Sequence, residues 1–221
     1  MRHARIAALL VLSAALAGPA RVGHSEAARF RVDPNASRIL IHVGKTGLLG
    51  FAGHTHEVAA PIRQGSITAD PDHLGAASVE VAVDAAALRV TGAGEPAGDV
   101  AQVQRTMLGP ECLDAARFPD IHFSSTGVTG LGRQPDGHRI AVRGALTLHG
   151  VTRAITVPAR IDFKGDTIEA SGAVTIRQTD FGIRPISKAG LVNVKDELEL
   201  EWRVVASADG TPSRSAAGPG R

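Results

Sequence analysis

Between residues 139 and 178 the chain alternates apolar and polar residues with a period of two. This alternation predicts half-buried β-strands, because successive side chains of a strand point to opposite faces of a sheet. Short segments at 149–152 and 164–167, both with glycine, interrupt it. We therefore predict three antiparallel strands joined by two tight hairpins. The residues expected on their apolar face are Ile140, Val142, Gly144, Leu146, Leu148, Ile155, Val157, Ala159, Ile161, Phe163, Ile168, Ala170, Gly172, Val174 and Ile176.

The alternation also predicts how these strands pair, since directly opposed residues of an antiparallel pair share a face. In the first hairpin we expect His149 to lie opposite Thr152, and in the second we expect Phe163 to lie opposite Ile168. With these registers every apolar residue opposes another apolar residue. A slip by one residue would mix the two faces in both hairpins.

The middle of this apolar face consists of small residues, namely Gly144, Ala159, Ala170 and Gly172. Protein interiors are closely packed, so small residues in the middle of a core face leave room for other atoms. Either a helix or side chain from elsewhere in the chain or a bound ligand fills that room. The pattern leaves both alternatives open.

The rest of the chain predicts further strands and one helix. The strands are expected at residues 30–32, 38–44, 65–69, 78–84, 120–128 and 197–205. Val100, Val103 and Met107 have helical spacing after Asp99, a residue type that caps helices, and Gly109 and Pro110 end the helix. The chain is therefore all-β, with about eight antiparallel strands and one inserted α-helix. We expect an eight-stranded barrel that can enclose a small ligand, with a two-sheet sandwich as the alternative.

Both ends of the chain differ from this middle part. Residues 1–27 combine Arg2 and Arg5 with an apolar stretch at 6–16 and small residues before the expected cleavage site, which predicts a signal peptide. Residues 207–221 are rich in Gly, Pro, Ser and Ala and are expected to form a disordered tail. We therefore expect a domain at 28–206 in a periplasmic or secreted protein, without a membrane span or lipid anchor.

Charge and cysteine content limit the partners, disulfides and metal sites that we expect. Residues 28–206 contain nearly equal numbers of basic and acidic residues, so bulk charge gives no reason to expect a nucleic-acid partner. Cys112 is the single cysteine, which excludes an intrachain disulfide and a cysteine-based metal site. In an exported protein such a residue is most often a small buried apolar side chain.

Five segments in order resemble the bacterial YceI-like, polyisoprenoid-binding proteins. They are the segments at residues 30–33, the glycine-rich turn before Phe51, and those at 113–125, 144–153 and 177–183. The resemblance extends over residues 29–206. It implies an exported, lipocalin-like eight-stranded barrel that holds an isoprenoid-like lipid, such as a polyprenyl phosphate, or a quinone in its interior. It implies no established catalytic residues and leaves open whether the barrel forms a homodimer.

If the resemblance holds, one set of apolar side chains lines or flanks a tunnel for the ligand. These residues are Val142, Leu146, Ile155, Val157, Val174, Ile176, Leu200 and Trp202. Arg153 is expected at the end of the same strand ladder, where its guanidinium group would meet an anionic head group. The alternative interpretation of Arg153 is an exposed arginine at a turn.

Two other functions are weighed against the binding of a lipid. His54 and His56 are two residues apart on a predicted strand, so both point to one face and can chelate Zn²⁺ or Cu²⁺ with a third ligand such as His42 or His122. The alternative is a pair of solvated or hydrogen-bonded histidines near the end of the barrel. An enzyme acting on lipid-like substrates is the last candidate. We find no catalytic triad, carboxylate pair or cofactor fingerprint, and therefore expect no enzyme and no further cofactor.

Overall fold

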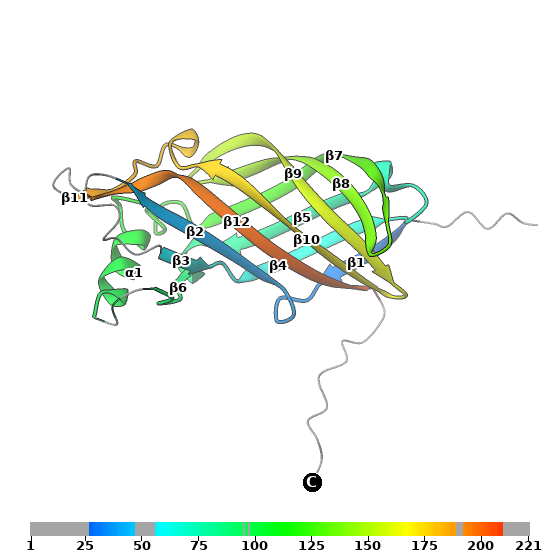
Figure 1. Cartoon of the computed structure of the whole chain (residues 1–221), viewed down its shortest axis with the longest axis horizontal. Coiled ribbons are helices and arrows are strands. Elements are labelled where there is room, and N and C mark those ends of the chain that lie inside the picture. The colour runs from blue at the N-terminus through cyan, green and yellow to red at the C-terminus, as the bar shows by residue number, and fades with distance from the viewer. Residues whose placement is uncertain (1–26, 47–55, 95, 97, 189–191, 210–221) are drawn as a thin grey trace, which may run out of the picture.

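The computed structural model describes residues 27–46, 56–94, 96, 98–188 and 192–209, which form strands and one α-helix (Figure 1). The strands are β1 (Ala28–Val32), β2 (Arg38–Thr46), β3 (His56–Ala59), β4 (Ile62–Ala69), β5 (Ser78–Asp84), β6 (Arg89–Val90), β7 (Asp120–Gln134), β8 (Gly137–Leu148), β9 (Val151–Lys164), β10 (Thr167–Arg177), β11 (Ser187–Lys188) and β12 (Val192–Ala208). The helix is α1 (Val100–Leu108), and short 3₁₀ turns lie at Leu74–Ala76, Ala85–Ala87 and Thr179–Phe181.

The strands form a closed antiparallel barrel with eight positions in its wall. Three of these positions contain two short strands that run in the same direction, β1 with β2, β3 with β4, and β5 with β6. The other five are β7, β8, β9, β10 and β12, and the pairing of β1 with β12 closes the ring. This confirms the predicted eight-stranded barrel over the sandwich. Residues 33–37 interrupt one wall position, and β1 and β2 on either side of them both pair with β12.

The register of the second predicted hairpin is confirmed, whereas that of the first is wrong by two residues. Phe163 lies opposite Ile168, as expected. Thr152, however, lies opposite Thr147 and not opposite His149. The turn is shorter than expected because His149 and Gly150 both have positive φ, 52° and 71°, which lets these two residues alone connect the strands. A shift by an even number leaves the faces unchanged, so the predicted inward residues still point inward.

The interior contains two clusters of buried apolar side chains, one toward each end of the barrel. The α1-end cluster lies beside the helix and includes Leu113, Leu146, Leu148, Ile176 and Phe181. The far-end cluster lies toward the β7–β8 and β9–β10 turns and includes Phe30, Val32, Ile140, Ile161, Ile168, Ala170, Val204 and Ala206. Phe123 and Ile39 pack against both clusters, so these two side chains mark the middle of the barrel.

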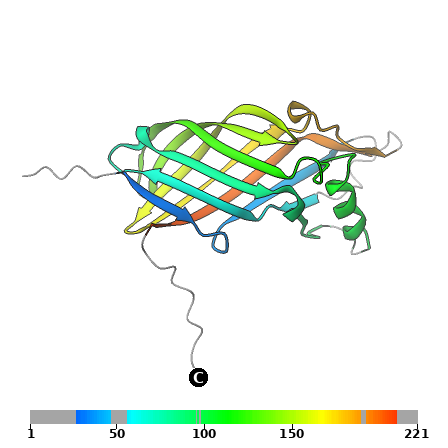
Figure 2. The same cartoon turned by 180° about the vertical axis from the view of Figure 1, so that it is seen from behind.

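The helix α1 lies at one end of the barrel, as Figure 1 and the reverse view in Figure 2 both show. It is confirmed with the expected bounds, although the Asp99 side chain makes no capping hydrogen bond. The side-chain amide of Gln104 attaches the helix to the barrel: its Oε1 accepts from the Val90 N–H at 2.8 Å and its Nε2 donates to the Leu88 carbonyl at 2.8 Å. No helix in the described part of the chain is long and apolar enough to cross a bilayer.

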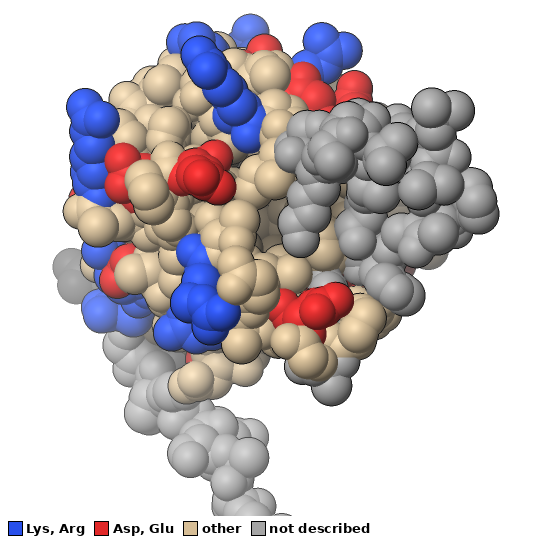
Figure 3. All heavy atoms as spheres, turned by 90° about the vertical axis from the view of Figure 1, so that its left-hand side faces the viewer, with Lys and Arg blue, Asp and Glu red and all other residues tan. Residues whose placement is uncertain are grey.

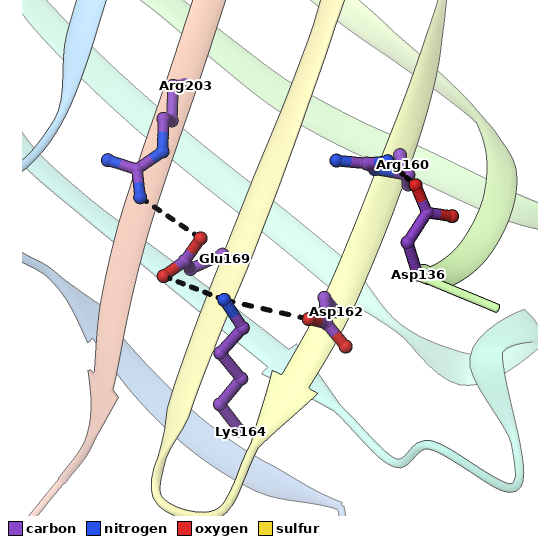
Figure 4. Close-up of polar contacts among 6 residues, drawn as sticks. All are labelled: Asp136, Arg160, Asp162, Lys164, Glu169 and Arg203. Atoms are coloured by element: carbon purple, nitrogen blue, oxygen red, sulfur yellow. Dashed lines mark hydrogen bonds and ion pairs between the residues drawn. The ribbon is translucent and has the colours of Figure 1, made fainter.

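The outer surface of β9, β10 and β12 has a network of ion pairs (Figure 4). The Glu169 carboxylate contacts Lys164 at 3.1 Å and Arg203 at 3.0 Å, and Lys164 also lies 3.7 Å from Asp162. Hydrogen bonds from Lys164 and Arg203 lower the pKa of Glu169 below its ordinary value. These charged side chains lie on the outward face, so alternation along the same strands leaves the inward face apolar.

Strand β12 runs to Ala208, whereas the sequence predicts the end of the domain at residue 206. In β12, Ser207 lies opposite Thr167 and Ala208 lies opposite Phe30. The Asp209 N–H also donates to the Arg29 carbonyl at 2.9 Å. The predicted signal peptide lies almost wholly outside the described residues, and the tail does so from residue 210.

Candidate functional site

The barrel encloses a cavity of about 490 Å³. This volume lies within the range of about 300–1,000 Å³ that is common for ligand pockets. Inward-pointing side chains around it, such as Ile41, Val81, Ile155 and Leu200, are only half-buried, although they point to the inside of a closed wall. Their exposed surface therefore faces the cavity.

The lining of the cavity is mostly aliphatic. All eight apolar residues predicted from the sequence contribute to it, from β8, β9, β10 and β12. The other walls add residues that the sequence did not single out as a site: Ile39, Ile41 and Val43 of β2, Val79, Val81 and Val83 of β5, Ile121 and Phe123 of β7, and Val103 and Met107 of α1. The alternation in residues 38–44 and 78–84 already marks the β2 and β5 residues as inward, whereas α1 and Phe123 required the topology.

Polar residues line the cavity near its α1 end. They are His56, Asp99, Gln102, Thr106 and Gln178. Gln178 is buried, and its Nε2 donates to the Lys195 carbonyl at 2.7 Å. Figure 3 shows this end, where basic and acidic side chains are scattered among uncharged residues of the described surface. The cavity is thus polar toward α1 and aliphatic inside, an arrangement that suits a molecule with a polar group at one end of an apolar body.

Arg153 does not line the cavity. It lies opposite Leu146 because of the two-residue shift in register, and it is exposed at the α1 end of β9. Its Nη1 donates to the neighbouring Thr152 carbonyl at 3.2 Å. A role in binding an anionic head group remains a prediction for this residue.

Two of the small residues on the apolar face accommodate aromatic rings of the protein itself. A Cβ atom at Gly144 would lie 2.5 Å from Cζ of Phe123, and one at Gly172 would lie 2.8 Å from Cζ2 of Trp202. Both distances are far below van der Waals contact, so only glycine leaves the space that each ring occupies. Of the two alternatives for the small residues, a side chain from elsewhere is therefore correct at these two positions.

The predicted metal site lies only partly in the described structure. His54 is outside the described residues, and His56 lies in β3 and lines the cavity. Within the described ranges, no group of three or more His, Cys, Asp or Glu side chains is arranged to hold a metal ion. His42 instead points to two carboxylates, with Nδ1 3.9 Å from Glu57 and Nε2 3.8 Å from Glu201. The His54–His56 site remains a prediction.

Cys112 also lines the cavity, next to the C-terminal end of α1. Burial raises the pKa of its thiol to about 11. The thiol is therefore protonated at neutral pH and a poor nucleophile, since thiolate is the reactive form. In this environment Cys112 acts as a small apolar side chain, as the sequence predicted.

Comparisons with known proteins agree with this architecture. A family model described as the YceI-like domain matches residues 30–206. A UPF0312 protein of Enterobacter sp. (strain 638) is 26% identical over 174 residues, which cover 73% of this chain and 79% of the relative. A Protein YceI of Salmonella arizonae is 31% identical over 91 residues, which cover 38% of this chain and 44% of the relative.

The fold is also similar to a solved structure. The crystal structure of BcnA from Burkholderia cenocepacia has a TM-score of 0.63 and 19% sequence identity, and the match covers 80% of this chain and 99% of that chain. At this identity the likeness concerns the fold alone. The family model matches most of the chain, including the strands that form the barrel described above. This protein therefore belongs to the YceI-like domain family.

Proposed function

We propose that this protein is an exported binding protein that holds a long apolar ligand, an isoprenoid-like lipid or quinone, inside the barrel. The observation that carries the proposal is the aliphatic cavity of about 490 Å³ lined by half-buried side chains. An apolar cavity in contact with solvent on one side is a favourable site for hydrocarbon. The polar residues near α1 would then lie beside the more polar end of the ligand.

Burial of hydrocarbon alone supplies enough free energy for tight binding. Transfer of one CH₂ group from water is worth about 0.8 kcal/mol, so a dozen such groups contribute about 10 kcal/mol before the entropic cost of association. No ion pair with the ligand is needed for this energy. This fits a cavity in which Asp99 is the single Asp, Glu, Lys or Arg among the described lining residues.

Binding is favoured over catalysis by the chemistry of the described lining residues. The thiol in the cavity, that of Cys112, has a raised pKa and is protonated at neutral pH, so it is a poor nucleophile. Conversion of a quinone or prenyl substrate by the purified protein would contradict this part of the proposal.

Native mass spectrometry of the protein purified from the envelope of bacteria expressing the full chain tests the proposal. We expect a mass adduct that organic solvent extracts as an apolar lipid. Val174→Trp should reduce the adduct, because Val174 lines the cavity and the larger side chain would occupy it. Thr175→Trp is the matched control, since Thr175 is the next residue of β10 and is exposed.

Two results would contradict the proposal. One is wild-type protein without an apolar adduct, and the other is an adduct that Val174→Trp and Thr175→Trp retain equally. Export is tested on the same sample by the N-terminal sequence: a mature protein should begin near residue 28, whereas an intact Met1 would refute the signal peptide.

A further inference from the structure

The cavity is large enough for only part of a very long hydrocarbon chain. A protein cavity of about 150 Å³ holds one benzene molecule, which corresponds to about 25 Å³ for each carbon atom. On this scale the volume of about 490 Å³ holds roughly 20 carbons, or about four isoprene units.

The far end of the barrel is closed to any longer chain. The cavity reaches Val32, Ile161 and Val204 of the far-end cluster, which contribute to its lining. Beyond them, Ile168 and Ala206 belong to the same cluster but do not line the cavity, and both are 0% exposed. A chain that enters from the α1 end therefore meets packed side chains before it can leave at the far end.

Two aromatic rings occupy part of the interior at mid-barrel. Phe123 comes from β7 and Trp202 from β12, which are four positions apart in an eight-position ring and therefore lie on opposite walls. Phe123 packs against both interior clusters, and Trp202 is paired with Ile39, which also packs against both. Both rings line the cavity and both are half-buried, so their free faces bound the space open to a ligand.

The glycines beneath these rings allow them to lie close to the wall. Gly144 lies on β8 next to β7, and Gly172 lies opposite Trp202 on β10. A Cβ at either position would overlap the ring. The space that remains inside the barrel is thus set by the two rings in the positions that the glycines permit.

We infer that the barrel encloses no more than about four isoprene units of its ligand, so that affinity stops rising beyond this chain length, and that Phe123 and Trp202 set this limit. The inference rests on the proposed function, and it names these two residues as determinants of ligand specificity. A longer isoprenoid leaves its remaining units outside the α1 end, where they gain no burial within the barrel.

A homologous series of isoprenoid alcohols tests the inference on delipidated full-length protein. Dissociation constants are measured for alcohols of two, three, four, five and eight units. Affinity should rise about fourfold for each added CH₂-sized group while the chain is enclosed. Beyond four units it should reach a plateau, with the eight-unit alcohol within about tenfold of the four-unit alcohol.

Variants of the two rings should move the plateau toward longer chains. Trp202→Ala removes an indole ring, and Phe123→Ala removes a phenyl ring. In the Trp202→Ala protein, the five-unit alcohol should therefore bind at least about tenfold more tightly than the four-unit alcohol. Phe123→Leu and Trp202→Leu serve if an alanine variant fails to fold. Phe163→Ala is the matched control, because Phe163 packs on the far-end cluster without lining the cavity.

The outcomes separate this inference from the proposed function. Failure to bind an alcohol of any length would refute the proposed function and the length limit together. Affinity that rises steadily to eight units would refute the limit and leave the proposed function intact. A plateau that stays in place in both ring variants, or moves equally in Phe163→Ala, would refute the role of Phe123 and Trp202.

Discussion

Truncation of inward-pointing isoleucines should destabilise the barrel very unequally along its axis. Ile168 lies in the far-end cluster, is 0% exposed and does not line the cavity. Ile155 points inward from β9, lines the cavity and is only half-buried. The same substitution, isoleucine to alanine, thus removes atoms surrounded by protein at one position and atoms partly facing a hollow at the other.

The expected magnitudes follow from what each side chain contacts. Replacing a fully enclosed isoleucine by alanine costs about 2–5 kcal/mol, and the upper half of this range applies where neighbours cannot collapse into the space. Ile168 meets this condition in a closed wall, so we expect a loss of about 4 kcal/mol. Ile155→Ala removes contacts on one side of the residue and enlarges a cavity that already exists, so we expect a loss of about 1–2 kcal/mol of unfolding free energy.

Urea denaturation of delipidated Ile168→Ala and Ile155→Ala proteins measures both values. Removal of lipid matters, because a bound ligand would restore the missing contacts around Ile155 and raise its apparent cost. Equal losses of unfolding free energy, or a larger loss in Ile155→Ala, would refute the conclusion that the barrel is hollow at Ile155 and packed at Ile168. The test requires no knowledge of the ligand.

Three further predictions concern the helix, the outer surface and the histidines. Gln104→Leu removes both hydrogen bonds to Leu88 and Val90, so the amides of α1 should exchange with deuterium faster while those of β8 do not change; unaltered exchange in α1 would contradict the attachment. The lowered pKa of Glu169 contributes stability that is present above the ordinary glutamate pKa and is lost as the pH falls through the folded-state pKa. Glu169→Gln should therefore flatten the decline of unfolding free energy on the acid side. Superimposable profiles of unfolding free energy against pH in wild type and variant would argue against this contribution. A site at His54 and His56 predicts that wild-type protein retains Zn²⁺ or Cu²⁺ that the double alanine variant lacks, and equal metal contents by elemental analysis would exclude it.

Much of the barrel could be predicted because burial on one face leaves a regular trace in the sequence. Val142, Val157, Val174 and Leu200 line the cavity because strand parity and a closed wall admit no other orientation. The turn at His149 could not be predicted in detail, since a non-glycine residue at positive φ is uncommon and the longer turn matches the faces equally well.

The share of the interior filled by the protein itself was not predictable. The sequence around Gly144 and Gly172 does not indicate which side chain packs against each glycine. The rings that do so, Phe123 and Trp202, come from strands whose neighbours are fixed only when the barrel closes. The same holds for α1, whose apolar positions predict a helix but not its place beside the cavity. Long-range pairing, which local patterns do not encode, decides these features.

The strand that completes the ring is also the last one in the described part of the chain. β12 pairs with β10, with β2 and with β1, so the first and final described strands hold each other in place. A polypeptide that emerges from a ribosome or a translocation channel with its N-terminus first cannot finish folding until residues near 208 are free. Until that moment β1 has only β4 beside it, and the ring stays open on the side where β12 will lie.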